Sequence, residues 1–328
     1  MTKISFLDLV PVTQGGSVAR SLANAADLAR HAEALGFARY WVAEHHGMTG
    51  IASAATSVVL AHIGHATSTI RIAAGGIMLP NHAPMVIAEQ FGTLEALFPG
   101  RVDLGLGRAP GSDQRVAHAL RRNLASDERQ FPQDVVELQA FLAGDERLGI
   151  RAVPGEGARV PLWILGSSLF GAQLAAMLGL PYAFASHFAP DALDEALDIY
   201  RRQFKPSAQL AEPYAAAAFN VFAADSREEA ELLASSQQQA FVALRTGQPG
   251  LLPPPVAGYK DGLPPNARAI LDHVLICSAV GTAEDVAAGL KGFVARTGVD
   301  EVIVASSMFD HEARKRSLAL TIEAAKSL

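Results

Sequence analysis

Short apolar segments alternate with amphipathic, Ala/Leu-rich segments from one end of the chain to the other. Apolar, β-branched runs are typical of strands buried on both faces, and the amphipathic segments are typical of helices that cover them. Eight such strands predict an α/β protein whose parallel sheet closes into a (β/α)8 barrel, the TIM-barrel architecture. The expected strands are residues 4–10, 39–43, 70–75, 102–107, 162–165, 182–185, 216–222 and 301–305.

The chain is expected to form a single domain over residues 1–328, because no composition break or sequence repeat marks a second one. Two segments, about 109–160 and about 237–280, are longer than the usual connection between a strand and its helix. We interpret them as insertions. Long loops beside a barrel mouth often act as lids, but they also serve only to cover the barrel ends or to form a subunit contact. Both interpretations stay open.

Hydrogen-bonding residues or glycines follow most of the expected strands. In a (β/α)8 enzyme the chemistry lies at the C-terminal ends of the strands, so the residues directly after each strand are the candidates for function. They are Asp8, Glu44-His45-His46, Gly75-Gly76, Gly107-Arg108, Gly166-Ser167-Ser168, Ser186-His187 and Ser306-Ser307.

The segment Gly166-Ser167-Ser168 precedes an Ala/Leu-rich helix. Hydroxyl groups and free backbone N–H groups at a helix N-terminus favour an anion, so this segment is a candidate phosphate site. An ordinary serine N-cap is the alternative, since many helices have one. Arg108 is a candidate second contact, because a guanidinium group pairs bidentately with phosphate. A surface salt bridge is the alternative for Arg108.

Two further segments at the strand ends carry possible chemistry. Gly75-Gly76 allows a flat ligand to approach the backbone closely, or it forms a plain turn. Glu44-His45-His46 places groups that titrate near neutral pH at the barrel mouth. Acid–base catalysis, metal ligation and structural hydrogen bonding are the three interpretations of this segment.

Metal ligation was weighed for five residues that might meet in one cavity, namely Glu44, His45, His46, Asp103 and His187. The sequence lacks a His-Glu-x-x-His helix and a Cys-x-x-Cys pair, so we expect no metal site. The glycines around Arg108 do not form a dinucleotide fingerprint either, because Pro110 interrupts the start of the helix that such a site requires. Cys277 is interpreted as a buried apolar residue.

Composition narrows the choice of partners. The formal net charge is −6, which provides no broad basic surface for nucleic acid. With Cys277 as the only cysteine, no intrachain disulfide is possible. We find no apolar run of about 20 residues that would cross a membrane, and no signal peptide, so a cytoplasmic location is expected.

The sequence resembles the bacterial-luciferase-like (LLM-class) flavin-dependent monooxygenases over nearly its whole length. The resemblance implies a monooxygenase that uses reduced FMN and O₂ to oxidise a small organic substrate. The most specific blocks are Trp41 to His46, Ala74 to Gln90 and Phe98 to Arg108, supported by Leu165 to Ser168, Gly179 to His187 and Asp310 to Arg314.

Carried over position by position, the resemblance implies a role for each candidate. The FMN phosphate is held by Arg108, Ser167 and Ser168. The isoalloxazine ring lies against Gly75-Gly76, across a cis peptide bond. Glu89 lies near the flavin, and Ser186 at the end of the sixth strand is included among the cofactor-binding residues. His45 is the catalytic residue that acts as acid or base.

The resemblance has limits that leave alternatives open. Gly107 stands where the luciferases have a reactive cysteine, so light emission is not implied. Because no nicotinamide-binding motif is present, we expect a separate flavin reductase to supply the reduced FMN, and a homo-oligomer is expected from the family.

The runner-up function is F420-dependent hydride transfer by the same barrel. A non-catalytic flavin-binding protein is the alternative from another class, and a metal-dependent hydrolase is the least favoured. The substrate depends on loops whose conformation the sequence does not give.

Overall fold

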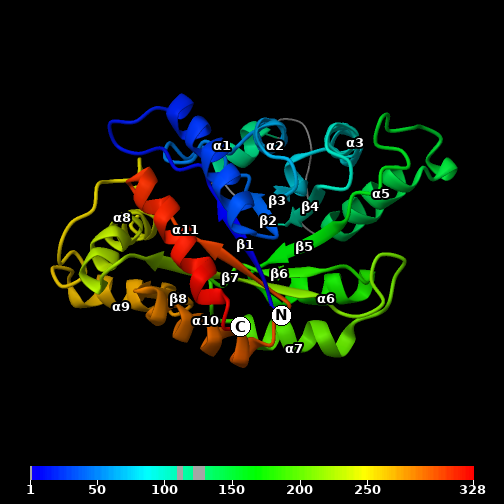
Figure 1. The fold of residues 1–328 in the computed structure, drawn as a ribbon. Helices are drawn as coiled ribbons and strands as arrows, with labels where there is room; N and C mark the ends of the chain where they lie inside the picture. The colour runs from blue at the N-terminus through cyan, green and yellow to red at the C-terminus, as the bar shows by residue number, and fades with distance from the viewer. Residues whose placement is uncertain (1, 109–113, 121–129) are drawn as a thin grey trace.

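Nine parallel strands form one sheet in the computed structural model, which describes residues 2–108, 114–120 and 130–328. The sheet runs in the order β6-β5-β4-β3-β2-β1-β9-β7, and the pairing of β6 with β7 closes these eight strands into a barrel (Figure 1). The predicted (β/α)8 barrel is therefore confirmed. The strands are β1 (Lys3–Asp8), β2 (Arg39–Val42), β3 (Arg71–Met78), β4 (Val102–Gly107), β5 (Leu162–Gly166), β6 (Tyr182–Phe184), β7 (Ala215–Ala223), β8 (Ser278–Gly281) and β9 (Glu301–Ala305).

Strand β8 was not predicted, and it lies outside the closed ring. Asn220 of β7 pairs with Ala305 of β9 and also with Ser278 of β8, so β8 occupies the edge of β7 opposite to β9. Strand β6 uses that same edge nearer the start of β7. The long β7 therefore serves two neighbours in succession, which explains how a ninth strand joins without opening the barrel.

Helices cover the outside of the barrel (Figure 1). Gly36 and Gly179 have a positive φ, and each caps the C-terminal end of the preceding helix. Thr282 begins another helix and forms a capping box with Asp285. The helices are α1 (Val18–Leu35), α2 (Thr56–Ala66), α3 (Pro84–Leu97), α4 (Gln114–Leu120), α5 (Phe131–Ala143), α6 (Leu169–Leu178), α7 (Leu193–Gln203), α8 (Arg227–Arg245), α9 (Pro265–Val274), α10 (Ala283–Thr297) and α11 (His311–Ala325), with short 3₁₀ turns η1 (Leu79–Asn81) and η3 (Glu146–Leu148).

The two long segments contain parts of this helical layer. In the first, α5 packs against α3 on the outside of the barrel, while residues 109–113 and 121–129 lie outside the described part of the chain. In the second, the chain after α8 returns to the loop that follows β1. There the N–H of Leu252 donates to the carbonyl oxygen of Val12 at 2.8 Å, and the N–H of Gln14 donates to the carbonyl oxygen of Leu252 at 2.9 Å.

Strand β1 ends at Asp8 and not at Val10 as predicted. The Asp8 carboxylate accepts a hydrogen bond from the N–H of Val10 at 2.8 Å, and Val10 adopts a φ of 52°, which interrupts the extended backbone. The same carboxylate accepts hydrogen bonds from Tyr40 at 2.6 Å and from Arg314 at 2.8 Å. Asp8 therefore stabilises the fold, although its position after a strand made it a candidate for function.

A buried ionic network fills the N-terminal end of the barrel. The Arg39 guanidinium donates to Asp103 at 3.0 Å and also to Glu301, and it lies over the Trp163 ring at 5.0 Å. Glu301 also accepts hydrogen bonds from Ser5 at 2.5 Å and Tyr214 at 2.9 Å. Burial alone lowers the pKa of Arg39, but the charges of Glu301 and Asp103 outweigh it and raise that pKa. In (β/α)8 barrels, residues at the N-terminal end of the strands stabilise the fold.

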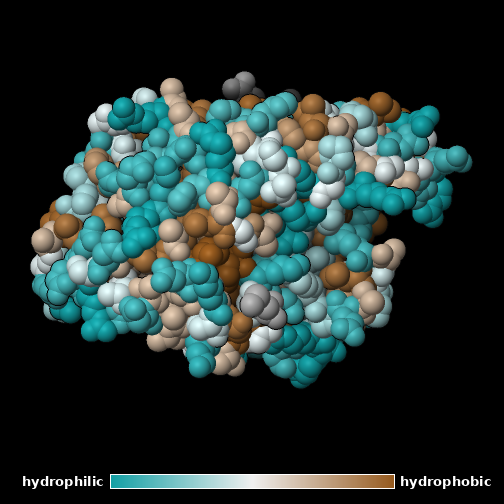
Figure 2. Space-filling view, viewed as in Figure 1, coloured by the Kyte–Doolittle hydropathy of each residue, from teal (hydrophilic) through white to brown (hydrophobic). Residues whose placement is uncertain are grey.

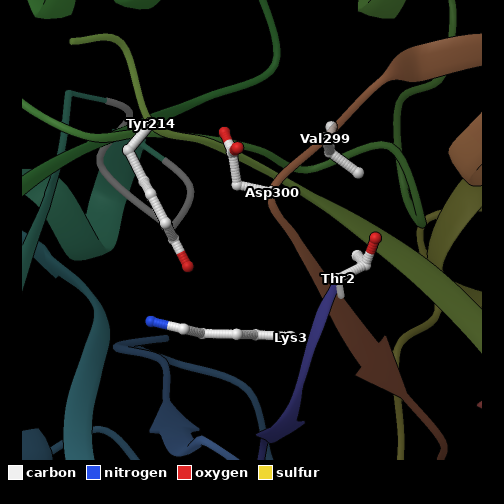
Figure 3. A pocket seen from close by; sticks show the side chains of 5 residues that line it. All are labelled: Thr2, Lys3, Tyr214, Val299 and Asp300. Atoms are coloured by element: carbon white, nitrogen blue, oxygen red, sulfur yellow. The ribbon is translucent and has the colours of Figure 1, made fainter. Parts of the chain in front are cut away.

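A small pocket opens at this same end. Figure 3 shows the five side chains that line it, from Thr2, Lys3, Tyr214, Val299 and Asp300. Tyr214 donates to Glu301, and Asp300 accepts the N–H of Ala215 at 2.8 Å, so both polar groups are used to join strands. The pocket therefore belongs to the structural end of the barrel.

The surface seen in Figure 2 is mostly hydrophilic, with hydrophobic residues gathered near the C-terminal half of α11. Across the described residues, we find no helix with the length and apolar character needed to span a membrane.

Candidate active site

The C-terminal ends of the barrel strands, which we call the mouth, bring the candidate residues from distant parts of the sequence to one end of the molecule. Because the strands are parallel, the residues after β2, β3, β4, β5 and β6 all lie there. The candidates at the mouth are His45, Gly75-Gly76, Arg108, Ser167-Ser168 and Ser186.

Gly75 and Gly76 form a platform inside β3, because this strand runs on to Met78 and does not end at Gly75 as predicted. The peptide bond between them is cis, as the resemblance implied. A Cβ atom on Gly76 would lie only 2.7 Å from the carbonyl oxygen of Gly105 in β4, and one on Gly75 would lie 3.1 Å from the Trp41 side chain. The close approach of neighbouring strands therefore requires glycine at position 76, which is buried, while Gly75 is half-buried.

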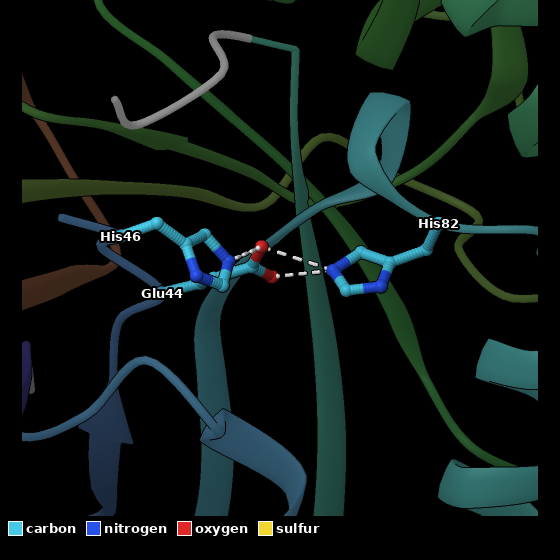
Figure 4. Close-up of side chains that lie close together, drawn as sticks. All are labelled: Glu44, His46 and His82. Atoms are coloured by element: carbon cyan, nitrogen blue, oxygen red, sulfur yellow. Dashed lines mark hydrogen bonds and ion pairs between the residues drawn. The ribbon is translucent and has the colours of Figure 1, made fainter. Parts of the chain in front are cut away.

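Glu44 is a buried carboxylate that lies between the imidazole rings of His46 and His82 (Figure 4). His46 contacts it through Nε2 at 2.6 Å, His82 through Nε2 at 2.9 Å, and the N–H of Met78 donates to it at 3.0 Å. Burial alone raises the pKa of Glu44, but the hydrogen bonds and the His82 charge outweigh it and lower that pKa. The N–H of Glu44 donates to the carbonyl oxygen of Gly76 at 3.1 Å, so this residue also fixes the platform.

The same cluster bears on the question of a metal. One donor atom each of Glu44, His46 and His82 lies within 4.8 Å of the others. These atoms are joined directly by hydrogen bonds, and we interpret the cluster as a carboxylate that orients two imidazoles. Asp103, one of the five residues weighed as ligands, lies at the other end of the barrel with Arg39. His82 was not among those residues, although it stands inside one of the blocks that carry the resemblance.

His45 and His187 face the same region of the mouth. His45 is half-buried, and its charge interacts with that of His187. Burial lowers the pKa of His187 to about 4, and the neighbouring His45 contributes to the shift. His187 is therefore neutral at neutral pH.

The predicted phosphate site is assembled by β4, β5 and α6. Ser168 occupies the N-cap position of α6, but its side chain makes no capping hydrogen bond, and Ser167 and Ser168 are both exposed. The Arg108 guanidinium lies 4.3 Å from the centre of the Phe170 ring, in the first turn of α6. Arg108 forms no ion pair with any other described residue. We call Arg108, Ser167 and Ser168 the phosphate cradle.

Ser186 and Glu89 are the two cofactor-binding candidates outside the platform and the phosphate cradle. Ser186 is buried, and its hydroxyl group donates to the carbonyl oxygen of Ala218 at 2.5 Å, so it joins the chain after β6 to β7. Glu89 is half-buried in α3, and its carboxylate forms no hydrogen bond with the other candidates within the described ranges. Their contact with a cofactor stays a prediction.

The structure adds a chain of amides that the sequence analysis missed. Asn220, buried in β7, donates to the carbonyl oxygen of His187 at 2.8 Å and accepts from Gln237 of α8 at 2.9 Å. Gln237 in turn accepts the N–H of Ser307 at 2.9 Å. The side-chain amides of Asn220 and Gln237 each donate one hydrogen bond and accept another. They therefore connect the segment after β6 and the segment after β9 to α8.

Comparison with known proteins agrees with this arrangement. The family model for luciferase-like monooxygenases matches residues 2–301. A luciferase-like monooxygenase of Escherichia coli (strain K12) is 52% identical over 325 residues, covering 99% of this chain and 97% of that protein. The N-acetyl-S-alkylcysteine monooxygenase of Bacillus subtilis (strain 168) is 36% identical over 256 residues, covering 76% of this chain and 75% of that protein.

Solved structures share the fold. The crystal structure of apo-MsnO8 matches with a TM-score of 0.88 and 32% identity, covering 100% of this chain and 99% of that one. Two more distant structures show the fold alone. One is the oxygenating constituent of 3,6-diketocamphane monooxygenase from Pseudomonas putida in complex with FMN, with a TM-score of 0.73 and 18% identity, covering 100% of this chain and 99% of that one. The other is an F420-dependent secondary alcohol dehydrogenase, with a TM-score of 0.71 and 16% identity, covering 98% of this chain and 98% of that one. The chain belongs to the luciferase-like monooxygenase family.

Proposed function

We propose that this protein is a monooxygenase that uses reduced FMN and O₂ to oxidise a small organic molecule. The observation that carries the proposal is the arrangement of the mouth, where the phosphate cradle, the open Gly75-Gly76 platform and His45 lie at one end of the barrel. A phosphate, a flat ring and a proton donor or acceptor are the three features that a flavin site must accommodate.

The residues present fit such a cofactor. The uncapped N-terminus of α6 and the Arg108 guanidinium favour a phosphate dianion. The platform carries no side chain, and Gly75 is half-buried, so its backbone can support a ring. When bound, reduced FMN supplies the two electrons that activate O₂.

The chain's own residues would bind, orient and transfer protons. Arg108, Ser167 and Ser168 bind the phosphate, and the backbone of Gly75-Gly76 supports the ring. Glu44 holds the platform through its N–H. His45 holds or releases a proton at one of its ring nitrogens.

The decisive experiment follows reduced flavin in oxygenated buffer. Protein carrying chemically reduced FMN is prepared without oxygen, mixed with oxygen in a stopped-flow instrument, and monitored by flavin absorption. We expect a reoxidation phase clearly slower than that of free reduced FMN, because the site separates the flavin from water. Reoxidation identical to that of free FMN contradicts the proposal. Tight FMN binding with unchanged oxygen reactivity indicates a flavin-binding protein that is not an enzyme.

The second candidate function is F420-dependent hydride transfer, supported by the fold shared with an F420-dependent secondary alcohol dehydrogenase. A binding preference for F420 over FMN would favour it. For the monooxygenase, the relatives suggest the first substrates to screen, namely N-acetyl-S-alkylcysteines and cyclic ketones. We further propose that a separate reductase supplies the reduced FMN, and that the protein is a cytoplasmic homo-oligomer.

Replacing Arg108 by Ala is expected to weaken FMN binding by about 10- to 100-fold, because a charge-assisted hydrogen bond to phosphate contributes roughly 1.5–3 kcal/mol. Riboflavin, which lacks the phosphate, should bind the variant and the unmodified protein equally. Fluorescence quenching of both flavins measures the two affinities. Arg108→Lys is the matched control and should lose less, since it keeps the charge. Equal losses for FMN and riboflavin would place Arg108 against the ring.

A further inference from the structure

Arg245 is an exposed arginine at the C-terminal end of α8. Its Nη2 atom donates to the carbonyl oxygen of Phe188 at 3.3 Å, and the guanidinium carbon lies 4.9 Å from the centre of the Phe188 ring. Across residues 2–108, 114–120 and 130–328, Arg245 forms no ion pair. A guanidinium group has five N–H donors, so donors remain that can bind an anion from solution.

The face of α8 that carries Arg245 points toward the mouth. Gln237, Phe241 and Arg245 are spaced four residues apart, so they lie on one face of the helix. Gln237 accepts the N–H of Ser307, which follows β9. Phe241 contacts the ring of Phe188, which follows β6, with 6.4 Å between the ring centres. This face of α8 therefore extends along the mouth from the end of β9 to the end of β6.

The aromatic rings beside Arg245 are accessible to a ligand. The Phe188 residue is 37% exposed, and Phe241 is half-buried. Asn220 donates to the carbonyl oxygen of His187 at 2.8 Å, so the backbone next to Phe188 is held in place by the fold. The chain thus presents an apolar surface beside an unpaired cation. Such a surface suits a molecule that has both an apolar part and an anionic group.

A series of neighbouring residues connects Phe188 to the platform. Phe188 directly follows His187, and the charge of His45 acts on His187. Glu44, which directly precedes His45, donates its N–H to the carbonyl oxygen of Gly76 at 3.1 Å. A small molecule held by the guanidinium at one end therefore lies at the same mouth as the residue to which we assign proton transfer.

The charge of the whole protein bears on which molecules can use this surface. The formal net charge of −6 disfavours the approach of an anion in general, so a site that accepts an anionic substrate needs a local cation. Arg245 provides one beside the chain that follows β6. Arg108 follows β4 and belongs to the phosphate cradle.

We propose that Arg245 binds a carboxylate group of the organic substrate, whose apolar part packs against Phe188 and Phe241. The substrate class is thereby narrowed to small carboxylic acids with an apolar portion. The inference rests on the proposed function, because it concerns the substrate of that reaction. A guanidinium pairs with a carboxylate in a fixed, bidentate geometry, so Arg245 would also orient the substrate in the mouth.

The test compares acids with neutral partners of the same shape. Calorimetric titration of the full chain in saturating FMN measures the binding of octanoate and octanamide, and of an N-acetyl-S-alkylcysteine and its methyl ester. We expect each acid to bind about tenfold more tightly than its neutral partner, because the hydrogen bond to the guanidinium is charge-assisted. Arg245→Gln should bind acid and neutral partner equally to within about twofold.

Three controls accompany the titration. Arg245→Lys keeps the charge and should keep part of the preference for the acids. Arg202→Gln removes another exposed arginine, in α7, and should keep the whole preference. Because Arg245 is exposed, Arg245→Gln should leave the thermal unfolding temperature unchanged, and it should bind FMN and riboflavin as the unmodified protein does.

The outcomes separate this inference from the proposed function. The inference is overturned if the unmodified protein prefers neither acid, or if Arg245→Gln keeps the preference. It is also overturned if Arg245→Gln weakens the binding of FMN but not of riboflavin, since Arg245 would then contact the flavin phosphate. The stopped-flow experiment tests the proposed function independently. Reoxidation identical to that of free FMN, together with an acid preference that Arg245→Gln abolishes, would refute the proposed function and leave the carboxylate site standing.

Discussion

Substitution of His45 by Ala is expected to lower product formation by about two to four orders of magnitude, because a positioned general acid or base contributes a factor of this size. FMN binding should change by less than about twofold, since the phosphate cradle and the platform are untouched. Product formation with an N-acetyl-S-alkylcysteine, or with the substrate that screening identifies, measures the first effect, and fluorescence quenching measures the second.

His46→Ala is the matched control for this prediction. Its Nε2 atom contacts the Glu44 carboxylate at 2.6 Å, so we assign His46 a role in orienting the cluster rather than in proton transfer. The control should lose less activity than His45→Ala. The assignment of His45 is refuted if His45→Ala weakens FMN binding but forms product at the normal rate once the site is saturated.

Replacing Arg39 by Leu is expected to lower the free energy of unfolding by about 3–5 kcal/mol, because it leaves the buried Glu301 carboxylate without its cation. Glu301 is fully buried and loses its ion pair, while Asp103 keeps Arg71 at 2.6 Å. The shift of the urea unfolding midpoint measures the loss, provided that the transition is two-state.

An exposed ion pair provides the matched control for Arg39. Arg202, with 68% of its side chain exposed, pairs with Asp198 at 2.8 Å, and Arg202→Leu should cost no more than about 0.5 kcal/mol. Combining Arg39→Leu with Glu301→Leu should recover part of the loss, because the double variant removes the unpaired charge. Equal effects of Arg39→Leu and Arg202→Leu would show that the buried network does not stabilise the fold.

Much of the barrel could be predicted because its strands are buried on both faces and therefore appear in the sequence as continuous apolar runs. Strand β8 escaped prediction for the opposite reason. Its four residues, Ser278 to Gly281, are only partly buried and pair with a single neighbour, so their sequence has no apolar run. The end of β1 at Asp8 was not predicted, because it depends on the hydrogen bond from the N–H of Val10 to the Asp8 side chain. Hydrophobic periodicity carries no information about such a bond.

The site was predictable only where local sequence determines local structure. Gly75-Gly76 and the serines before α6 stand out in the sequence because a glycine pair and a helix N-terminus can be recognised locally, and their contact with a cofactor stays a prediction. The functions of polar side chains depended on the fold. Asp103 and Glu44 both lie in or beside apolar strands. Asp103 stabilises the N-terminal end of the barrel, whereas Glu44 orients imidazoles at the mouth. Asn220 and Gln237 gained their partners only through barrel closure.

The hydrogen bonds between Leu252, Val12 and Gln14 bear on how this enzyme can be altered. They join main-chain atoms, and the buried Leu252 and Val12 side chains pack at the same place. Strand β8, which ends that segment, pairs with β7. Residues 246–251 are exposed, so they can be randomised in a library while Leu252 is kept, and such a library tests whether this segment influences substrate preference.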